Sequence, residues 1–528
     1  MATPQEYLDL VAAVNVSHSP ALTLQLQKML EAQPELADTN PKNPVVYQHH
    51  NTVMPSWPAN FVFPRSEAEL VKALDDRKNA YTSFRAMGDG YGFANAAATT
   101  GCLVRMAGMN DLLELQAENF RTDFDLDEDE YVRFEGGITV GKLNDALSAT
   151  GRTMIQQPGF KDLTVVGCSG AGGHGSGFGI PGISGFIRAL ELVGFDANKN
   201  VKVRRIEPTN GMTDPAKYAA WKAKQPNPAL YELVQDDVLF HSARCAQGHL
   251  GIISAATLQV TQKFQLKEDR WISTWAEAWP QVQQMMTNPS VHSVHVWINP
   301  YVTTKPSPTV LITRLTKTGQ PPWGIRGLGI LFGGKNVGTD LAALAAHNQP
   351  QKLGGATDFA LSLCAKMDVV LRSTEAMDFG PPNELAVNAA SMGFDASRAD
   401  EVMQKLIPQL EAWKAMNNCV TSPIGMRWVA KSEDFLSPQY GRDTIMLEMP
   451  ILAGTPNAVQ TLDLYANFMM DTFGARPHWG QQNPMTKAQF AKNYADGLPK
   501  FLSAFKTLNP LGLFDGPLTK QLGLRELV

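Results

Sequence analysis

The sequence has few cysteines, no long apolar run and no excess of basic residues. Its 528 residues include five scattered cysteines and no Cys-x-x-Cys pair, which argues against a disulfide framework and against a zinc site. The net charge of −5 gives no reason to expect nucleic acid or an anionic membrane as a partner. No stretch reaches the length of a membrane span, and the N-terminus lacks the basic start and apolar core of a signal peptide. These absences predict a cytoplasmic protein without a bound metal.

Glycine, in contrast, is concentrated in one stretch, between Asp162 and Gly185. So many glycines exclude a stable helix, because each loses much backbone entropy on folding. Apolar residues on both sides exclude a flexible linker. Backbone N–H groups without side chains form a concave anion site, which suits a pyrophosphate. A second glycine loop, residues 87–93, follows a predicted strand at 81–86 and suits the same ligand.

The glycine run also contains a weaker pattern. Gly170, Gly172 and Gly175 match G-x-G-x-x-G, the dinucleotide fingerprint of a strand–turn–helix unit. More glycine and Pro181 follow instead of a helix, and no acidic residue is placed to hold a ribose. A Rossmann unit is therefore not favoured, and a tight structural loop without a ligand remains an alternative.

The order of predicted elements indicates an α+β fold. Residues 4–36 are predicted helical, and 38–60 form a proline-rich arm. Ser66 and Glu69 form a capping box for a helix that runs to about residue 79, and 231–245 is predicted mostly helical. The second half has alternating strands with helices between them, typical of an antiparallel sheet with helices on one face. Its strands are predicted at 291–301, 309–315 and 444–449, and its helices at 339–348, 355–373, 396–416 and 457–473.

Four stretches together resemble a known superfamily. They are 64–71 with 85–90, Gly172-Gly173-His174-Gly175-Ser176-Gly177, 436–443 with 476–480, and 508–514. On these residues the chain resembles the FAD-dependent oxidases of the vanillyl-alcohol-oxidase/PCMH superfamily, nearest the branch of alditol and aldonolactone oxidases.

The resemblance implies a two-subdomain PCMH-type FAD-binding domain and a cap domain. The expected division is an N-terminal extension at 1–59, the FAD domain at 60–264, the cap at 265–485, and a C-terminal segment at 486–528 that returns to the FAD domain. The cofactor is expected to be FAD, with both glycine loops around its pyrophosphate. The expected FAD-binding residues are Arg85, Ala86, Met87, Gly88, Asp89, Gly90, Tyr91, Gly92, Pro158, Gly167, Cys168, Gly170, Gly172, Gly173, His174, Gly175, Ser176, Gly177, Gly248, Gly251, Ile252, Ile253 and Gln481.

The chain departs from the family pattern at three positions. Tyr91 stands where members with covalent flavin have histidine, so non-covalent FAD is predicted; attachment through Tyr91 or Cys168 remains the alternative. The sugar-alcohol oxidases have a Glu-x-Arg pair where this chain has Gly425-Met426-Arg427, and a lysine where it has Gln481. A pocket without these two charges favours a less polar substrate.

Several side chains are candidates for the chemistry. Arg427 is predicted to stabilise negative charge on the reduced flavin or on an alkoxide, or else to form a structural ion pair. His478 is a candidate base for the hydroxyl proton, or else a histidine packed beside Trp479. Glu448 is an alternative base unless it is a solvated strand carboxylate. His174 more simply braces its loop. The expected substrate-binding residues, on one face of the 291–301 strand, are His295, Trp297 and Asn299; the alternative is that helices cover this face.

The resulting hypothesis is an FAD-dependent oxidoreductase. It transfers hydride from the CH–OH group of a partly apolar alcohol (sterol-like, aromatic or a modified sugar) to non-covalent FAD, with oxygen or another electron acceptor. The alternative keeps the fold but gives the flavin a non-redox role, as in a cyclase or a binding scaffold.

Overall fold

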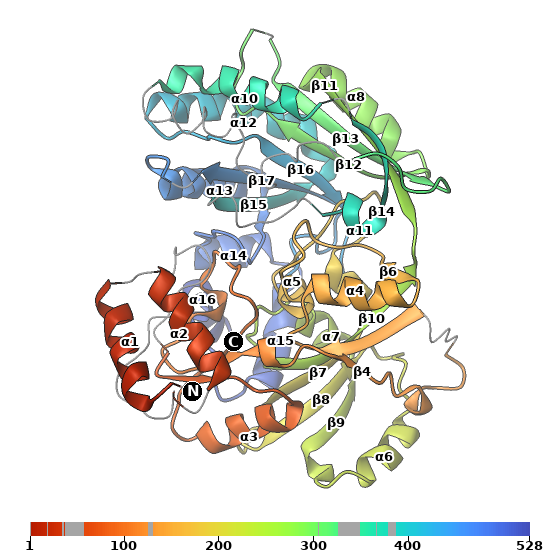
Figure 1. The fold of residues 1–528 in the computed structure, drawn as a ribbon, viewed down its shortest axis with the longest axis vertical. Coiled ribbons are helices and arrows are strands. Elements are labelled where there is room, and N and C mark those ends of the chain that lie inside the picture. Colours follow the sequence, from red (N-terminus) through yellow and green to blue (C-terminus); the bar gives the residue numbers. More distant parts are fainter. Residues whose placement is uncertain are drawn as a thin grey trace.

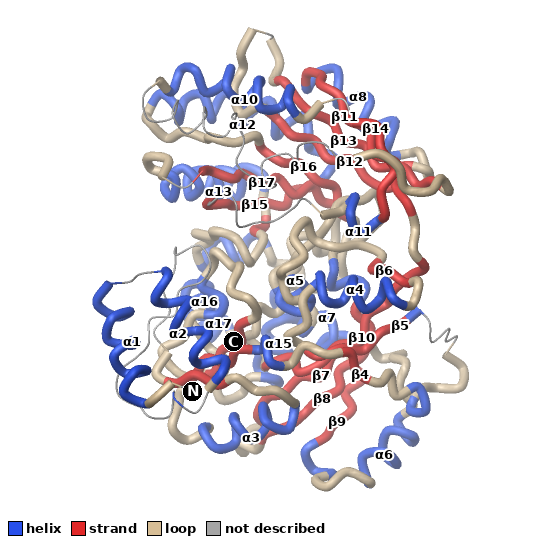
Figure 2. The backbone as a smooth tube through the Cα atoms, viewed as in Figure 1, coloured by secondary structure: helices blue, strands red, loops and turns tan. Residues whose placement is uncertain are grey.

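Two β-rich parts lie one above the other in this computed structural model (Figure 1). The structure describes residues 2–17, 20–33, 36, 58–124, 130–304, 306–325, 349–365, 367–378, 387–452 and 454–528. Figure 2 shows the strands as separate groups, one above and one below. The α+β prediction is confirmed. In the described part of the chain, no helix is long and apolar enough to cross a membrane.

A small parallel sheet begins the lower part. Its strand order is β1-β3-β2, with β1 at Asn60–Val62, β2 at Phe84–Met87 and β3 at Cys102–Arg105. Helix α3, Glu67–Arg77, begins where predicted, because the Ser66 side chain accepts a hydrogen bond from the backbone N–H of Glu69. The N-terminal helices α1 (Pro4–Ser17) and α2 (Pro20–Ala32) pack an apolar face on this sheet.

A larger sheet of seven strands completes the lower part. Its order is β4-β5-β10-β7-β8-β9, and β6 pairs with β10. The strands are β4 (Leu112–Leu113), β5 (Tyr131–Glu135), β6 (Arg152–Met154), β7 (Ile187–Phe195), β8 (Val201–Glu207), β9 (Tyr231–Gln235) and β10 (Ile252–Gln262). The helices are α4 (Val140–Ala149), α5 (Val165–Gly170), α6 (Pro215–Ala223) and α7 (Asp237–Ala243).

The upper part is built on an antiparallel sheet of eight strands, which confirms the predicted cap architecture. The order is β14-β11-β13-β12-β16-β17-β15-β18, and every pair is antiparallel. The strands are β11 (Gln265–Thr274), β12 (Val291–Ile298), β13 (Thr309–Thr318), β14 (Met367–Arg372), β15 (Val387–Asp395), β16 (Ile424–Val429), β17 (Thr444–Leu452) and β18 (Arg476–Pro477).

Helices pack on both faces of the cap sheet rather than on one. Helices α8 (Trp275–Met286), α12 (Ala399–Ala415) and α13 (Ala458–Phe473) cover the face that carries Val294 and Leu447. Helix α10, Leu353–Leu363, instead contributes Leu361 to a cluster with Trp297 on the opposite face. The short helix α11, Ser373–Ala376, follows β14.

The C-terminal segment runs back to the lower part (Figure 1). Its helices are α14 (Lys487–Asn493), α15 (Leu498–Leu508), α16 (Pro517–Leu522) and α17 (Leu524–Leu527). The carbonyl of Leu513 accepts a 2.7 Å hydrogen bond from the N–H of Phe84. The last residues of the chain therefore extend the lower domain at strand β2.

Three predicted elements were wrong in part. Residues 231–235 form strand β9, because they pair in parallel with β8, and only α7 after them is helical. The predicted helix at 355–373 ends at Leu363, since the β-branched pair at 369–370 belongs to strand β14. The glycine run does contain a helix, the six-residue α5, which tolerates two glycines within a packed surrounding. The predicted helix at 339–348 lies outside the described residues.

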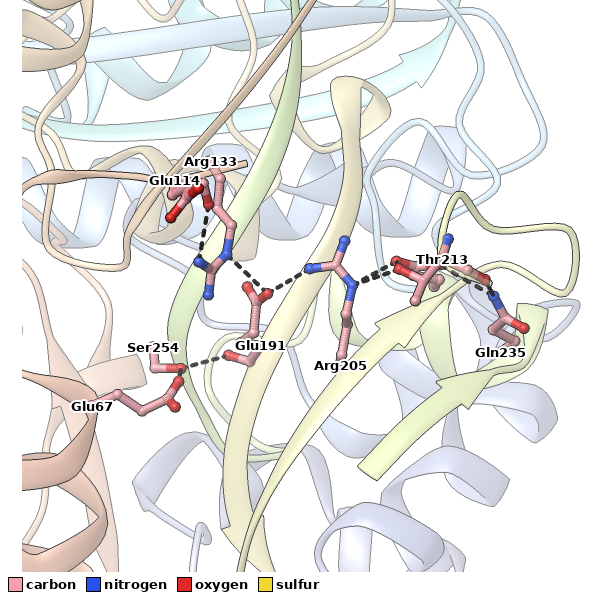
Figure 3. Close-up of polar contacts among 9 residues, drawn as sticks. Glu67, Glu114, Arg133, Glu191, Arg205, Thr213, Gln235 and Ser254 are labelled. Atoms are coloured by element: carbon pink, nitrogen blue, oxygen red, sulfur yellow. Dashed lines mark hydrogen bonds and ion pairs between the residues drawn. The ribbon is translucent and has the colours of Figure 1, made fainter. Parts of the chain in front are cut away.

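A buried ionic network joins three strands of the seven-stranded sheet, β5, β7 and β8 (Figure 3). Arg205 donates to Glu191 and to Glu207, both at 2.7 Å, and Arg133 donates to Glu191 at 3.1 Å. Burial by itself raises the pKa of Glu191, but the two guanidinium groups outweigh it and hold that pKa below its usual value. We call Arg133, Glu191, Arg205 and Glu207 the sheet network.

Candidate active site

A cavity of about 320 Å³ lies between the lower part and the cap sheet. Its walls come from residues 86–97, 158–174 and 243–253 of the lower part, and from strands β15, β16 and β17 and the 478–481 loop above. Most of the predicted cofactor residues line it. They are Ala86, Met87, Gly88, Asp89, Gly90, Tyr91, Gly92, Pro158, Gly167, Cys168, Gly170, Gly173, His174, Gly248, Gly251, Ile253 and Gln481.

At two positions of the lining, glycine leaves room for a ligand. A Cβ at Gly170 or Gly92 would have its nearest protein atom at 3.9 Å or 3.8 Å. A side chain there would therefore project into the cavity rather than into the protein. Buried Gln247 adds an Oε1 atom that accepts no hydrogen bond from any described residue, so a bound ligand can satisfy it. These residues fit FAD.

Arg85 does not line the cavity but supports its wall. The buried guanidinium donates to the carbonyls of Ala96 at 2.8 Å, Gly248 at 2.8 Å and Phe514 at 2.7 Å. Burial lowers its pKa to about 10. Arg85 therefore ties two cavity-lining segments to the C-terminal segment, and the prediction that it contacts the cofactor is corrected to this supporting role.

The second half of the glycine run also lies outside the cavity lining, because it fastens the lower part to the cap. Ser176 Oγ donates to the carbonyl of Val294 at 2.9 Å, and Gly177 N–H donates to that of Trp428 at 2.8 Å. The remaining predicted cofactor residues outside the lining are packed against protein. They are Gly172 against Pro438, Gly175 against Gln156, and Ile252 in the core around β1–β3.

The two candidate attachment residues both line the cavity. Tyr91 donates a long 3.4 Å hydrogen bond to Asp162 Oδ2. Burial raises the pKa of the Cys168 thiol to about 12, so that thiol is neutral and a poor nucleophile at neutral pH. The environment of Cys168 therefore does not activate it for bond formation with a flavin.

A charged cluster lines the cap side of the cavity. Arg427 Nη2 donates to Glu448 Oε2 at 2.6 Å, and Gln481 Nε2 donates to Glu448 Oε1 at 2.6 Å. Arg427 and Glu448 are 8% and 4% exposed. Arg427 therefore does form an ion pair, and Glu448 is not solvated. The pair is buried and borders the cavity. We call Arg427, Glu448 and Gln481 the site network.

The carboxylate that the sequence pattern lacks at position 425 is supplied from the neighbouring strand. Gly425 on β16 lies directly opposite Glu448 on β17, and side chains at opposed positions share one face of a sheet. The inference that an acidic group is missing from this region is therefore wrong. Trp297 lies on the other side of Gly425, and a Cβ at 425 would stand only 2.8 Å from its Cζ3.

Two histidines stand beside the site network. His174 and His478 line the cavity with their ring centroids 5.8 Å apart and their planes at 63°. His174 Nδ1 hydrogen-bonds to the carbonyl of Gly175 at 2.8 Å, and His478 Nδ1 accepts from the N–H of Gly480 at 3.1 Å. Burial and nearby Arg427 lower the pKa of His478 to about 4, and lower that of His174 still more strongly.

None of the three predicted substrate-binding residues lines the cavity. His295 pairs with Arg427 across strands β12 and β16 and is buried. Trp297 packs in an apolar cluster with Leu361 of α10. Asn299 is fully buried because it ties β12 to α10, donating to Asp358 Oδ1 at 2.7 Å. The period-2 pattern predicted that His295 and Trp297 share one sheet face, and this face also carries Arg427 and Glu448. Helix α10, however, covers part of that face.

Sequence reasoning missed several lining residues. Phe93, Phe160, Val387 and Ala389 line the cavity near the cap, and Gln247 lines it below. Gln247 stands before Gly248, so the glycines at 248 and 251 were an available signal for it. The apolar residues carried no such signal, because apolar side chains at strand ends and in loops are ordinary.

Comparison with family models gives two matches. A model described as "D-arabinono-1,4-lactone oxidase" matches residues 256–522, and one described as "FAD binding domain" matches residues 58–197. Together they cover both parts of the fold and both glycine loops.

Known proteins similar to this chain include L-gulono-1,4-lactone dehydrogenase of Mycobacterium tuberculosis, 22% identical over 88% of this chain and 96% of that protein. L-gulonolactone oxidase of Mus musculus is also 22% identical, over 87% of this chain and 93% of its own length. Among solved structures, a solvent-stable cholesterol oxidase has a TM-score of 0.69 at 18% identity, covering 91% of this chain and 98% of that one. This last likeness concerns the fold.

Proposed function

This chain belongs to the D-arabinono-1,4-lactone oxidase family, and on that premise we propose how it works on a hydroxyl group. It is an FAD-dependent oxidoreductase. The substrate is a ring or chain compound with a CH–OH group, which binds beside the site network and is oxidised to the carbonyl. The bound flavin supplies the hydride acceptor, and the protein supplies orientation and electrostatics.

One observation carries the assignment of the reacting end. The site network is the charged cluster of the cavity lining at the cap, where Glu448 fixes Arg427 at 2.6 Å. A fixed guanidinium in a site shielded from water stabilises negative charge as it develops on a substrate oxygen or on the flavin. Gln481 holds the second oxygen of Glu448 at 2.6 Å. In this proposal Arg427 is the electrostatic catalyst, and Glu448 and Gln481 are its positioning residues.

The substrate we propose is a partly apolar alcohol. Phe93, Phe160, Val387 and Ala389 border the cavity close to the cap, and they suit the hydrocarbon part of such a molecule. The carboxylate of Glu448 equally suits a polyhydroxylated lactone like those named for the relatives. A sugar-derived lactone is therefore the second candidate.

A substrate panel under anaerobic conditions tests the proposal. The holoenzyme is mixed with cholesterol in detergent, a benzylic alcohol, L-gulono-1,4-lactone and D-arabinono-1,4-lactone, and flavin bleaching is recorded. Bleaching by the first two supports the partly apolar alcohol, and bleaching by lactones alone supports the second candidate. A flavin that none of a broad alcohol panel reduces, but dithionite does, would favour the non-redox alternative.

The mode of cofactor attachment has its own test. We propose non-covalent FAD, supported by the neutral Cys168 thiol and by Tyr91 facing the Asp162 carboxylate. Acid precipitation is expected to release all yellow colour to the supernatant, and colour in the pellet would contradict the proposal.

A cytoplasmic location also remains a prediction. Plant relatives are named mitochondrial, so cell fractionation is the measurement that decides it.

A further inference from the structure

The two cavity histidines come from opposite parts of the molecule and differ in how they are held. His174 belongs to the glycine run of the FAD domain, and His478 follows strand β18 of the cap sheet. Each ring has a hydrogen bond between Nδ1 and the backbone, and the backbone of His478 itself also contacts its own ring. Among the described residues, no hydrogen bond reaches either Nε2, and both rings line the cavity.

The two backbone partners require opposite tautomers. The Gly175 carbonyl can only accept, so neutral His174 carries its hydrogen on Nδ1 and leaves a lone pair on Nε2. The Gly480 N–H can only donate, so His478 Nδ1 is bare and its hydrogen is on Nε2. The pair therefore presents one acceptor and one donor to the cavity.

Their surroundings keep both rings neutral. Burial disfavours the charged form of each, and the Arg427 guanidinium adds to this effect for both. His174 also faces His478 and His295, and the Glu448 carboxylate of the same cavity is already bound by Arg427 and Gln481. A protonated His478 would in addition lose its bond from Gly480.

We propose that this histidine pair recognises the hydroxyl of the substrate: His174 Nε2 accepts from the O–H, and His478 Nε2–H donates to the oxygen. The inference rests on the proposed function and adds a specificity-determining role for His174. It also corrects the role predicted for His478. Because its Nε2 already carries a hydrogen, His478 is a donor to the substrate rather than the base.

The pair distinguishes substrate from product. A hydroxyl both donates and accepts, whereas a carbonyl only accepts and leaves His174 Nε2 facing an oxygen lone pair. An unpaired polar group in a buried site weakens binding. The arrangement therefore favours the alcohol over its ketone or aldehyde and promotes release of the product.

The tautomers can be measured without knowing the substrate. The holoenzyme is labelled with ¹⁵N-histidine, and long-range ¹H–¹⁵N spectra are recorded between about pH 5 and 8. His174→Asn and His478→Asn assign the signals, and asparagine keeps a side-chain group that can replace the Nδ1 hydrogen bond. His292→Asn is the control, because His292 lies on β12 and does not line the cavity.

One Nδ1–H ring, missing in His174→Asn, and one Nε2–H ring, missing in His478→Asn, are expected, neither titrating in that range. The proposal is overturned if the rings assigned to His174 and His478 share one tautomer, or if either of them titrates near pH 6.5. The spectra remain interpretable when no alcohol reduces the flavin, so failure of the pair and failure of the proposed function are separate results.

A binding comparison then tests the recognised group. The probes are an alcohol that bleaches the flavin and its methyl ether, which accepts but cannot donate. Under anaerobic conditions the dissociation constant of the alcohol is taken from the concentration dependence of the reduction rate, and that of the ether from its inhibition of this reduction. Wild type is expected to bind the alcohol about 10-fold or more tightly than the ether. His174→Asn should lose this preference, while His478→Asn weakens both probes alike and His292→Asn changes neither.

FAD affinity serves as the counter-test. It is measured in both variants, because both rings line the cavity that fits FAD. A preference for the alcohol that survives in His174→Asn contradicts hydroxyl recognition. FAD affinity that falls in both variants, with alcohol binding unchanged, would show that the pair binds the isoalloxazine edge instead.

Discussion

Two buried networks, each built around an arginine–glutamate ion pair, lie in different surroundings. The sheet network joins strands β5, β7 and β8, and none of its four residues lines the cavity (Figure 3). The site network joins β16, β17 and the 478–481 loop, and all three of its residues line the cavity. The chemistry of the pairs is alike, so what differs is access to a ligand.

This difference separates a stabilising role from a functional one. Breaking a fully buried pair leaves a charge without water or partner, which is costly. Beside a cavity, water or ligand can solvate the remaining charge, so the cost to folding is smaller. Charge placed there instead acts on whatever binds. Substitutions in the sheet network should therefore lower stability more than activity. Substitutions in the site network should lower activity more than stability.

The largest expected effect is on stability, in the sheet network. Arg205→Met leaves Glu191 and Glu207 without the cation that bonds both at 2.7 Å. We expect the free energy of unfolding to fall by about 3–5 kcal/mol, measured by urea denaturation, with kcat of the folded enzyme unchanged. Arg121→Met is the control, because its pair with Asp123 is exposed and should contribute less than about 1 kcal/mol. An unchanged unfolding free energy in Arg205→Met would remove the distinction.

The next effect is on activity, in the site network. Glu448→Gln keeps the shape of the side chain but removes the charge that fixes Arg427. We expect kcat/KM for the bleaching substrate to fall about 100-fold, equivalent to about 2.7 kcal/mol, with the free energy of unfolding changed by less than about 1 kcal/mol. Glu207→Gln is the matched control and should show the reverse pattern. Equal losses of stability in both variants would mean that both networks are structural.

The two networks also show how far sequence reasoning reached. The chain order of helices and strands, the glycine loops and the antiparallel cap follow from local patterns, and most loop residues do line the cavity. Strand β9 was missed because its own residues do not indicate that it pairs with β8. Likewise, nothing local reveals that Gly425 and Glu448 are opposed. That register depends on pairing across the whole sheet, so the sequence did not show that a neighbouring strand places a carboxylate beside position 425.

The opposed positions lead to a third prediction, about packing beside the site network. In Gly425→Ala the new Cβ would lie 2.8 Å from Trp297 Cζ3, which should lower the free energy of unfolding by about 1–3 kcal/mol. Trp297→Leu removes the clash, so the two changes should be less than additive in a double-mutant cycle. Strict additivity would show that the indole does not restrict position 425.

The smallest expected effect is a pH dependence at the edge of the sheet network. Glu67 accepts a 2.7 Å hydrogen bond from Ser254 (Figure 3), and burial, followed by repulsion from Glu191, raises its pKa. A carboxyl with a raised pKa in the folded state lowers stability as pH rises from the unfolded value of about 4.3 through the folded one, because the unfolded chain then binds fewer protons. Glu191 has a lowered pKa and acts with the opposite sign, losing its contribution as pH falls.

Glu67→Gln separates these two signs. The variant should match wild type in stability near pH 4 and become the more stable protein as pH rises to 8, by less than the loss expected for Arg205→Met. Urea denaturation at several pH values measures the difference. Ser254→Ala should steepen the wild-type loss, since the Ser254 hydrogen bond holds the pKa of Glu67 down. A Glu67→Gln difference that is constant with pH would mean that Glu67 ionises alike in the folded and unfolded chain, and that the sheet network tolerates a third, partly buried carboxylate beside it without cost.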